Sequence, residues 1–161
     1  MVELKEINED NFEECIALKL NKEQSKFIAS NLFSLAEAYA IKNSGMNTPI
    51  TYGVYNDNIM VGFIMAVYQP IDKNDPEDFE NVFYLARMMI DSKYQGKGYG
   101  KQAMIKMIEI MKEYPYGAAD AVVLSCSRDN TIANKLYTSL GFIDTGETDE
   151  DGDVYLRLDL R

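Results

Sequence analysis

The stretch QGKGYG, residues 95–100, separates an apolar segment, YLARMMID (84–91), from the helical pattern KQAMIKMIEIMKEY (101–114). Glycine reaches left-handed dihedrals and has no Cβ to hold a ligand at a distance. A glycine-rich turn that enters a helix presents free N–H groups at the positive end of the helix dipole, where phosphate binds. Lys97 and Lys101 add local positive charge. We therefore predict a pyrophosphate-binding turn at a strand-to-helix junction; the alternative is a flexible connector.

Two common phosphate-binding motifs do not fit this turn. A dinucleotide fingerprint requires G-x-G-x-x-G, whereas Gly96, Gly98 and Gly100 are evenly spaced, two residues apart. A P-loop requires G-x-x-x-x-G-K-[ST], but the interval from Gly96 to Gly100 is one residue short. Gln102 also replaces the hydroxyl residue that would hold magnesium in a P-loop.

Hydrophobic periodicity predicts an α/β (α+β) fold in a single domain over residues 1–161. We expect helices at 8–18, 26–42, 101–114 and 128–140, and strands at 2–7, in a hairpin over 50–69, at 81–91, at 120–127 and in a final pair over 142–160. This order predicts a mixed, mostly antiparallel, twisted sheet of about seven strands, flanked by about four helices. Parallel pairing is expected at the two late strand–helix–strand crossovers.

Composition excludes several classes of protein. The net charge of -10 argues against nucleic acid and favours a cationic small molecule, although solubility alone would also explain it. The chain has no apolar run long enough for a membrane span, and its acidic N-terminus resembles no signal peptide, so we expect a cytoplasmic protein. With no histidine, any proton transfer must use Tyr, Asp, Glu, Lys, Cys or water.

The sequence offers no metal site. Cys15 and Cys126 match no metal spacing and are read as free thiols, with Cys126 less suited to nucleophilic catalysis than to core packing. The acidic run ETDEDGD (147–153) lacks the glutamate that closes a calcium loop, because Leu158 stands at that position. Asp151-Gly152 between two alternating segments instead predicts a hairpin turn.

One further helix carries a candidate catalytic residue. In DNTIANKLYTSLGF (129–142), helical spacing places Ile132, Leu136 and Leu140 on one side. Asn130, Asn134 and Tyr137 fall on nearly the opposite side, which suggests a polar pocket wall. The alternative is a tyrosine packed against a neighbouring element.

The turn Gln95-Gly96-Lys97-Gly98-Tyr99-Gly100 resembles the (Arg/Gln)-x-x-Gly-x-(Gly/Ala) signature of the GCN5-related N-acetyltransferases. The order of elements is also similar to that family over nearly the whole chain. YLARMMIDSKYQGKGYGKQAM followed by DNTIANKLYTSLGF resembles the bacterial spermine/spermidine (diamine) acetyltransferases. The resemblance implies that the turn binds the pyrophosphate of coenzyme A through its backbone amides.

The resemblance also implies the roles of individual residues. Tyr137 would be the general acid that protonates the leaving thiolate, and a backbone N–H at Met89 or Ile90 would align the thioester and stabilise the oxyanion. Asn130 and Asn134 would contact the cofactor together with residues 95–101, including Lys101. For the acceptor we expect Glu37, on the helix that borders the acceptor site in this family, with Tyr39 and Tyr84 as further candidates.

We therefore predict an acetyl-CoA-dependent N-acetyltransferase that acts on a diamine or polyamine, and a homodimer by analogy with the family. The acceptor could instead be an aminoglycoside, an amino acid or a protein N-terminus. From another class, the chain could be a non-catalytic acyl-CoA sensor or interaction module.

Overall fold

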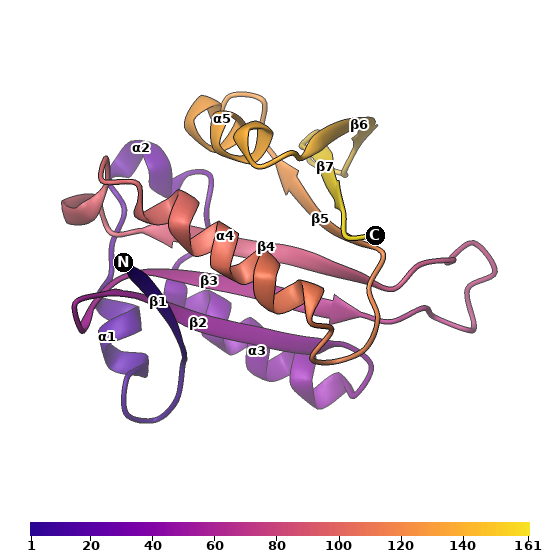
Figure 1. Ribbon diagram of the computed structural model, residues 1–161, viewed down its shortest axis with the longest axis horizontal. Coiled ribbons are helices and arrows are strands. Elements are labelled where there is room, and N and C mark those ends of the chain that lie inside the picture. Colours follow the sequence, from indigo (N-terminus) through magenta and orange to yellow (C-terminus); the bar gives the residue numbers. More distant parts are fainter.

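The most apolar segments form the centre of a seven-stranded sheet in the computed structural model, which describes residues 1–161 (Figure 1). β3 (Ile59–Gln69) is buried over nearly its whole length, because it is paired on both edges and covered on both faces. The strand order is β1-β2-β3-β4-β5-β7-β6. The other strands are β1 (Val2–Glu6), β2 (Thr48–Asn56), β4 (Val82–Ile90), β5 (Ala121–Cys126), β6 (Ile143–Thr148) and β7 (Val154–Asp159).

Helices cover both faces of the sheet. α4 (Tyr99–Lys112) crosses one face of the sheet (Figure 1). It buries the side chains of Ala103, Met104, Met107, Ile108 and Met111, which form its methionine face. α5 (Thr131–Ser139) packs on the same core cluster through Tyr137. The opposite face of the sheet packs against α1 (Phe12–Ala17) and α3 (Asn31–Ser44), which contribute Cys15 and Ala38 to a smaller core cluster.

The sheet opens between β4 and β5. These two strands pair in parallel only over Val82–Tyr84 and Ala121–Val123, and every other strand pair is antiparallel. Beyond Tyr84 and Val123 the strands diverge, and β5 turns away toward α5 (Figure 1). The carboxyl halves of β4 and β5 therefore leave backbone groups without a strand partner at the centre of the molecule.

The predicted fold class and strand number agree with the structure, and the differences lie at helix boundaries and in one pairing. The helix expected at 26–42 begins at Asn31, because the Ser30 hydroxyl caps it by accepting from Phe33 N at 3.1 Å. A separate short helix, α2 (Lys22–Ser25), precedes it and was not predicted. Only the first late crossover gives parallel neighbours, since β7 lies between β5 and β6.

The two predicted hairpin turns are present. Asp57 and Asn58 adopt positive φ between β2 and β3, as a tight hairpin requires. Gly152 does the same between β6 and β7, where Asp149 Oδ1 accepts from the backbone N–H of both Asp151 and Asp153 at 2.9 Å. None of the helices is both long enough and apolar enough to cross a membrane.

Candidate active site

The three glycines of the turn have two different physical roles. Gly96 and Gly98 adopt left-handed φ values of 79° and 81°, which a residue with a Cβ adopts only under strain. At Gly100 a Cβ would lie 3.2 Å from Met88 Cε, so this glycine allows α4 to approach β4 closely. A short 3₁₀ helix, η1 (Ser92–Tyr94), connects β4 to this turn.

The turn presents backbone donors that the protein does not use. None of the backbone N–H groups of residues 96–101 donates to an acceptor in the chain, and the first bond at this end of α4 is Gln102 N to Gly98 O at 3.2 Å. Lys97 and Lys101 are both exposed beside them. Free N–H groups at a helix N-terminus, with two cations beside them, fit a pair of phosphate groups. No protein group competes for this position.

A groove of about 350 Å³ runs from the turn to α5, and we call it the glycine groove. Its lining is mainly apolar, which suits a long aliphatic ligand attached to the phosphates. Glycine and tyrosine residues of the turn, the end of β4 and one side of α5 all contribute. It is lined by Leu20, Gln24, Ile28, Met88–Ile90, Tyr94–Gly96, Gly98–Gly100, Asn130, Ile132, Ala133, Leu136 and Tyr137.

A second hollow, the β5 cavity, has a volume of about 310 Å³ and occupies the opening between β4 and β5. It shares Ile28, Met88, Asn130, Ala133 and Tyr137 with the glycine groove, so the two spaces adjoin at these residues. Its remaining lining comes from the segment before α3, from β4, from β5 and the loop after it, and from the β6–β7 turn. These residues are Phe27, Ala29, Tyr84–Arg87, Leu124–Ser127 and Asp153.

Tyr137 lies where the groove and the cavity meet. It is 8% exposed and packs edge-on against Phe142, with ring centroids 5.6 Å apart. Burial, and to a smaller extent the neighbouring Cys126, raise the pKa of the Tyr137 phenol above its usual range. The hydroxyl therefore keeps its proton at neutral pH, as a general acid must.

The faces of α5 differ from those predicted. Ile132 is 71% exposed rather than buried, and α5 packs on the core through Ala133, Leu136, Tyr137 and Leu140. Tyr137 therefore belongs to the buried stripe at helical spacing, and the interpretation that it lies opposite the apolar side is wrong. The reason is tertiary: the opening between β4 and β5 leaves space for one ring at the centre of the core.

Strand alternation decides which backbone groups of β4 point into the opening. Asp91 N donates to Val61 O at 2.8 Å, and Ile90 and Met89 lie opposite Gly62 and Phe63. In an antiparallel pair, alternate residues bond across, so the Met89 N–H points to β3. The N–H groups of Met88 and Ile90 point to the side where β5 has diverged. A shift of register at Met65/Ala66 leaves Ala86 as an extra residue on β4, in the cavity wall.

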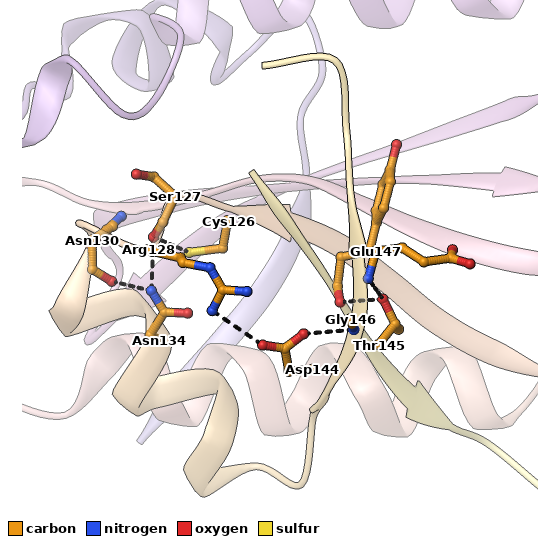
Figure 2. A network of polar contacts seen from close by, with 10 residues as sticks. Cys126, Ser127, Arg128, Asn130, Asn134, Asp144, Thr145, Gly146 and Glu147 are labelled. Atoms are coloured by element: carbon orange, nitrogen blue, oxygen red, sulfur yellow. Dashed lines mark hydrogen bonds and ion pairs between the residues drawn. The ribbon is translucent and has the colours of Figure 1, made fainter. Parts of the chain in front are cut away.

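Several predicted cofactor-binding side chains already have partners in the protein. Gln95 Nε2 donates to Ile90 O at 2.8 Å and to Gln24 Oε1 at 2.7 Å, which fixes the turn to β4 and α2. Tyr99 OH accepts from Asn56 Nδ2 at 2.9 Å. Asn134 Nδ2 donates to Ser127 O and Asn130 O, both at 2.8 Å (Figure 2). Gln95 and Tyr99 line the glycine groove together with Asn130, which caps α5, whereas Asn134 lines neither space.

The three predicted acceptor residues fall in different places. Tyr84 lines the β5 cavity, and its hydroxyl lies 2.9 Å from Ser125 Oγ across the opening. Glu37 accepts from Arg87 Nη2 at 3.3 Å, so it reaches the cavity only through the arginine that lines it. Tyr39 is 72% exposed and lines a separate hollow with Lys42 and Tyr116, so it does not join the others.

The two thiols are buried, as expected. Burial first, and Asp153 second, raise the pKa of Cys126 to about 11, so its thiol is protonated at neutral pH. Burial, with Glu14 as the smaller cause, raises the pKa of Cys15 to about 12. Neither environment produces the thiolate that covalent catalysis requires.

Sequence reasoning did not single out three parts of the site. Ile28 and Met88 line both spaces and Asp153 lines the β5 cavity, although nothing in their local sequence distinguishes them from other apolar or turn residues. Each reaches the site because a distant element packs beside the β4–β5 opening. Strict alternation of inward and outward side chains along β4 could have indicated Met88, but the extra residue at Ala86 interrupts that alternation.

Comparison with known proteins agrees with this geometry. The family model described as "Acetyltransferase (GNAT) family" matches residues 4–142. A spermine/spermidine N(1)-acetyltransferase of Bacillus subtilis is 29% identical over 152 residues, which cover 94% of each chain. The fold is similar to an aminoglycoside acetyltransferase in complex with coenzyme A (TM-score 0.74, 15% identity), over 99% of this chain and 95% of that one.

A second solved structure with this fold is the spermidine N-acetyltransferase of Vibrio cholerae in complex with CoA and spermine. It has a TM-score of 0.69 and 13% identity, and the match covers 99% of this chain and 95% of that one. The family match spans most of the chain, so this protein belongs to the GNAT acetyltransferase family. The class that the fold and the family define is an N-acetyltransferase. The resemblance of residues 95–100 to the signature of this family implied the same class.

Proposed function

We propose that this chain transfers an acetyl group from acetyl-CoA directly to a primary amine, and that the acceptor is a diamine or polyamine such as spermidine or spermine. The observation that carries the proposal is that the glycine groove and the β5 cavity meet at Tyr137. One space suits a nucleotide cofactor with a long aliphatic arm, and the other suits a small acceptor.

The turn at 95–101 would hold the pyrophosphate, through N–H groups that have no acceptor in the chain. The Met88 and Ile90 N–H groups, on the unpaired side of β4, would hold the pantetheine arm and polarise the thioester carbonyl. This assignment replaces Met89, whose N–H points to β3. Coenzyme A, when bound, supplies the thioester that donates the acetyl group.

Tyr137 would donate its hydroxyl proton to the departing thiolate sulfur. A free phenol and a free thiol have pKa values of about 10 and about 8.5, so the transfer is nearly balanced in water. Burial raises the pKa of the phenol here, and it would raise the pKa of a leaving thiol in the same place. Cys126, which lines the same cavity, shows this effect, since burial raises its pKa to about 11. Burial therefore shifts both pKa values in the same direction.

Three observations favour a slender cationic acceptor. The β5 cavity, at about 310 Å³, lies at the small end of ligand pockets, which span about 300–1,000 Å³. The protein has a net charge of -10, which attracts polycations from a distance. The Bacillus subtilis relative is named for spermine and spermidine.

The test is amine-dependent release of the coenzyme A thiol, measured by steady-state kinetics with a panel of acceptors. We expect release with spermidine, spermine and putrescine to exceed release with an aminoglycoside or an amino acid. Binding of acetyl-CoA with no amine-dependent release would favour a non-catalytic sensor and overturn the proposal. Faster release with an amino acid or an aminoglycoside would keep the enzyme class and change the acceptor.

A further inference from the structure

Of the two charged side chains in the β5 cavity, one has partners in the protein and the other has none. The cavity lining contains one basic and one acidic side chain, Arg87 and Asp153. Arg87 has partners: Nη2 donates to Glu37 at 3.3 Å and Nη1 donates to Ala86 O at 2.8 Å. The Asp153 carboxylate makes no hydrogen bond or ion pair with the protein, although its backbone N–H is held by Asp149 Oδ1 at 2.9 Å. The cavity therefore contains one uncompensated negative charge.

The fold holds Asp153 in this position. Asp153 directly precedes Val154, which pairs with Cys126 at the end of β5, and Cys126 lines the cavity together with Tyr137. The backbone N–H groups of Asp151 and Asp153 donate to the Asp149 carboxylate, which fixes the β6–β7 turn. The backbone position of Asp153, directly before β7, is therefore defined. Burial, and then the carboxylates of Asp149 and Asp151, raise the pKa of Asp153 above its usual range. A cation beside Asp153 would offset the repulsion from the Asp149 and Asp151 carboxylates.

From this geometry we infer that Asp153 is the counter-ion for the second, non-reacting ammonium group of the acceptor, and that it makes the enzyme selective for diamines and polyamines over monoamines. The inference deepens the proposed function and rests on it. One amine would reach the thioester beside Tyr137, while an ammonium further along the same chain would pair with Asp153. Asp153 is thus a specificity-determining residue.

A role as general base for the reacting amine fits less well. A carboxyl group has a pKa of about 4, and a primary ammonium has a pKa of about 10.4. Transfer of the proton to the carboxylate would be uphill by about 6 pKa units, so Asp153 would supply little of the neutral amine that reacts. The same carboxylate binds an ammonium well, because pairing in a partly buried site exceeds pairing in water.

The experiment compares Asp153→Asn with Asp151→Asn. Both variants remove one carboxylate from the same turn, but Asp151 is exposed and does not line the cavity. Spermidine and n-butylamine serve as acceptors, with acetyl-CoA saturating. We expect Asp153→Asn to lower kcat/KM for spermidine at least tenfold and for n-butylamine less than threefold. Asp151→Asn should change both by less than twofold, and Asp153→Glu should recover part of the spermidine activity.

Equal losses with both amines, or no loss with Asp153→Asn, would overturn the inference while the acetyltransferase proposal stands. If the unmodified enzyme acetylates no amine, the proposed function fails by itself. Thermal stabilisation by spermidine, with coenzyme A present, then decides the inference. Stabilisation of the unmodified protein that Asp153→Asn loses and Asp151→Asn keeps would support it, and identical responses in all three proteins would overturn it.

Discussion

The glycine turn, residues 95–101, and the β5 cavity belong to one candidate site and are built from the chain in different ways. The turn is seven consecutive residues, 95–101, whose φ angles and free N–H groups follow from the residue types themselves. The cavity draws its lining from segments that lie far apart in sequence: Phe27–Ala29, Tyr84–Met88, residues between Leu124 and Tyr137, and Asp153. Local sequence therefore predicted the turn in detail and the cavity only in outline.

The comparison is tested most severely at Tyr137, which both spaces share. We expect Tyr137→Phe to lower kcat about 100-fold, because a positioned general acid contributes roughly 10²–10⁴ in rate. Binding of acetyl-CoA should change little, since the ring remains. The measurement is steady-state thiol release from pH 6 to 9. Tyr114→Phe is the matched control, because Tyr114 packs on the same core cluster and lines neither space. Unchanged turnover in Tyr137→Phe across this pH range would remove the assigned acid.

A second test asks whether water is excluded from the buried Cys126 thiol in the cavity wall. Cys126 has a raised pKa, about 11 against 9.0, so the folded state holds this proton more tightly than the unfolded state. Its contribution to the free energy of unfolding is complete below pH 9 and is lost as the pH rises toward 11, with a slope of up to about 1 kcal/mol per pH unit. Urea unfolding from pH 7 to 10.5 measures this slope. Cys126→Ala should reduce it; an unchanged slope would mean that water reaches the thiol.

A third test separates the local conformation of the turn from its ligand. Gly96 and Gly146 both have a φ of 79°, and a Cβ at either would meet nothing within 4 Å. Alanine at either position should therefore cost about 1 kcal/mol of stability through left-handed strain alone. Only Gly96→Ala should also raise the Kd for coenzyme A, by about tenfold, since it disturbs the N–H groups of the turn. Calorimetric titration of both variants measures this, and equal Kd values would argue against phosphate binding at the turn.

The smallest expected effect concerns Tyr39. Because Tyr39 is 72% exposed in a hollow apart from the β5 cavity, Tyr39→Ala should leave KM for spermidine within twofold of its original value. Steady-state kinetics checks this. A larger rise in KM would mean that the acceptor extends over α3 beyond the cavity.

Some features followed from residue types and their spacing, because they depend on few neighbours. The fold class, the number of strands, the helix after the glycine turn, the hairpin turns and the turn itself belong to this group. Dihedral preference and hydrophobic periodicity act over one or two turns of chain, so short segments of sequence contain them.

Other features were decided only by the tertiary structure. Several features depend on the opening between β4 and β5. They are the burial of Tyr137, the direction of the Met88 and Ile90 N–H groups, the pairing of Arg87 with Glu37 and the position of Asp153 in the cavity lining. That opening arises because a parallel pair ends after three residues while α5 and the β6–β7 turn pack beside it. Which side chain faces such a space is set by the packing of elements distant in sequence, so no local pattern determines it.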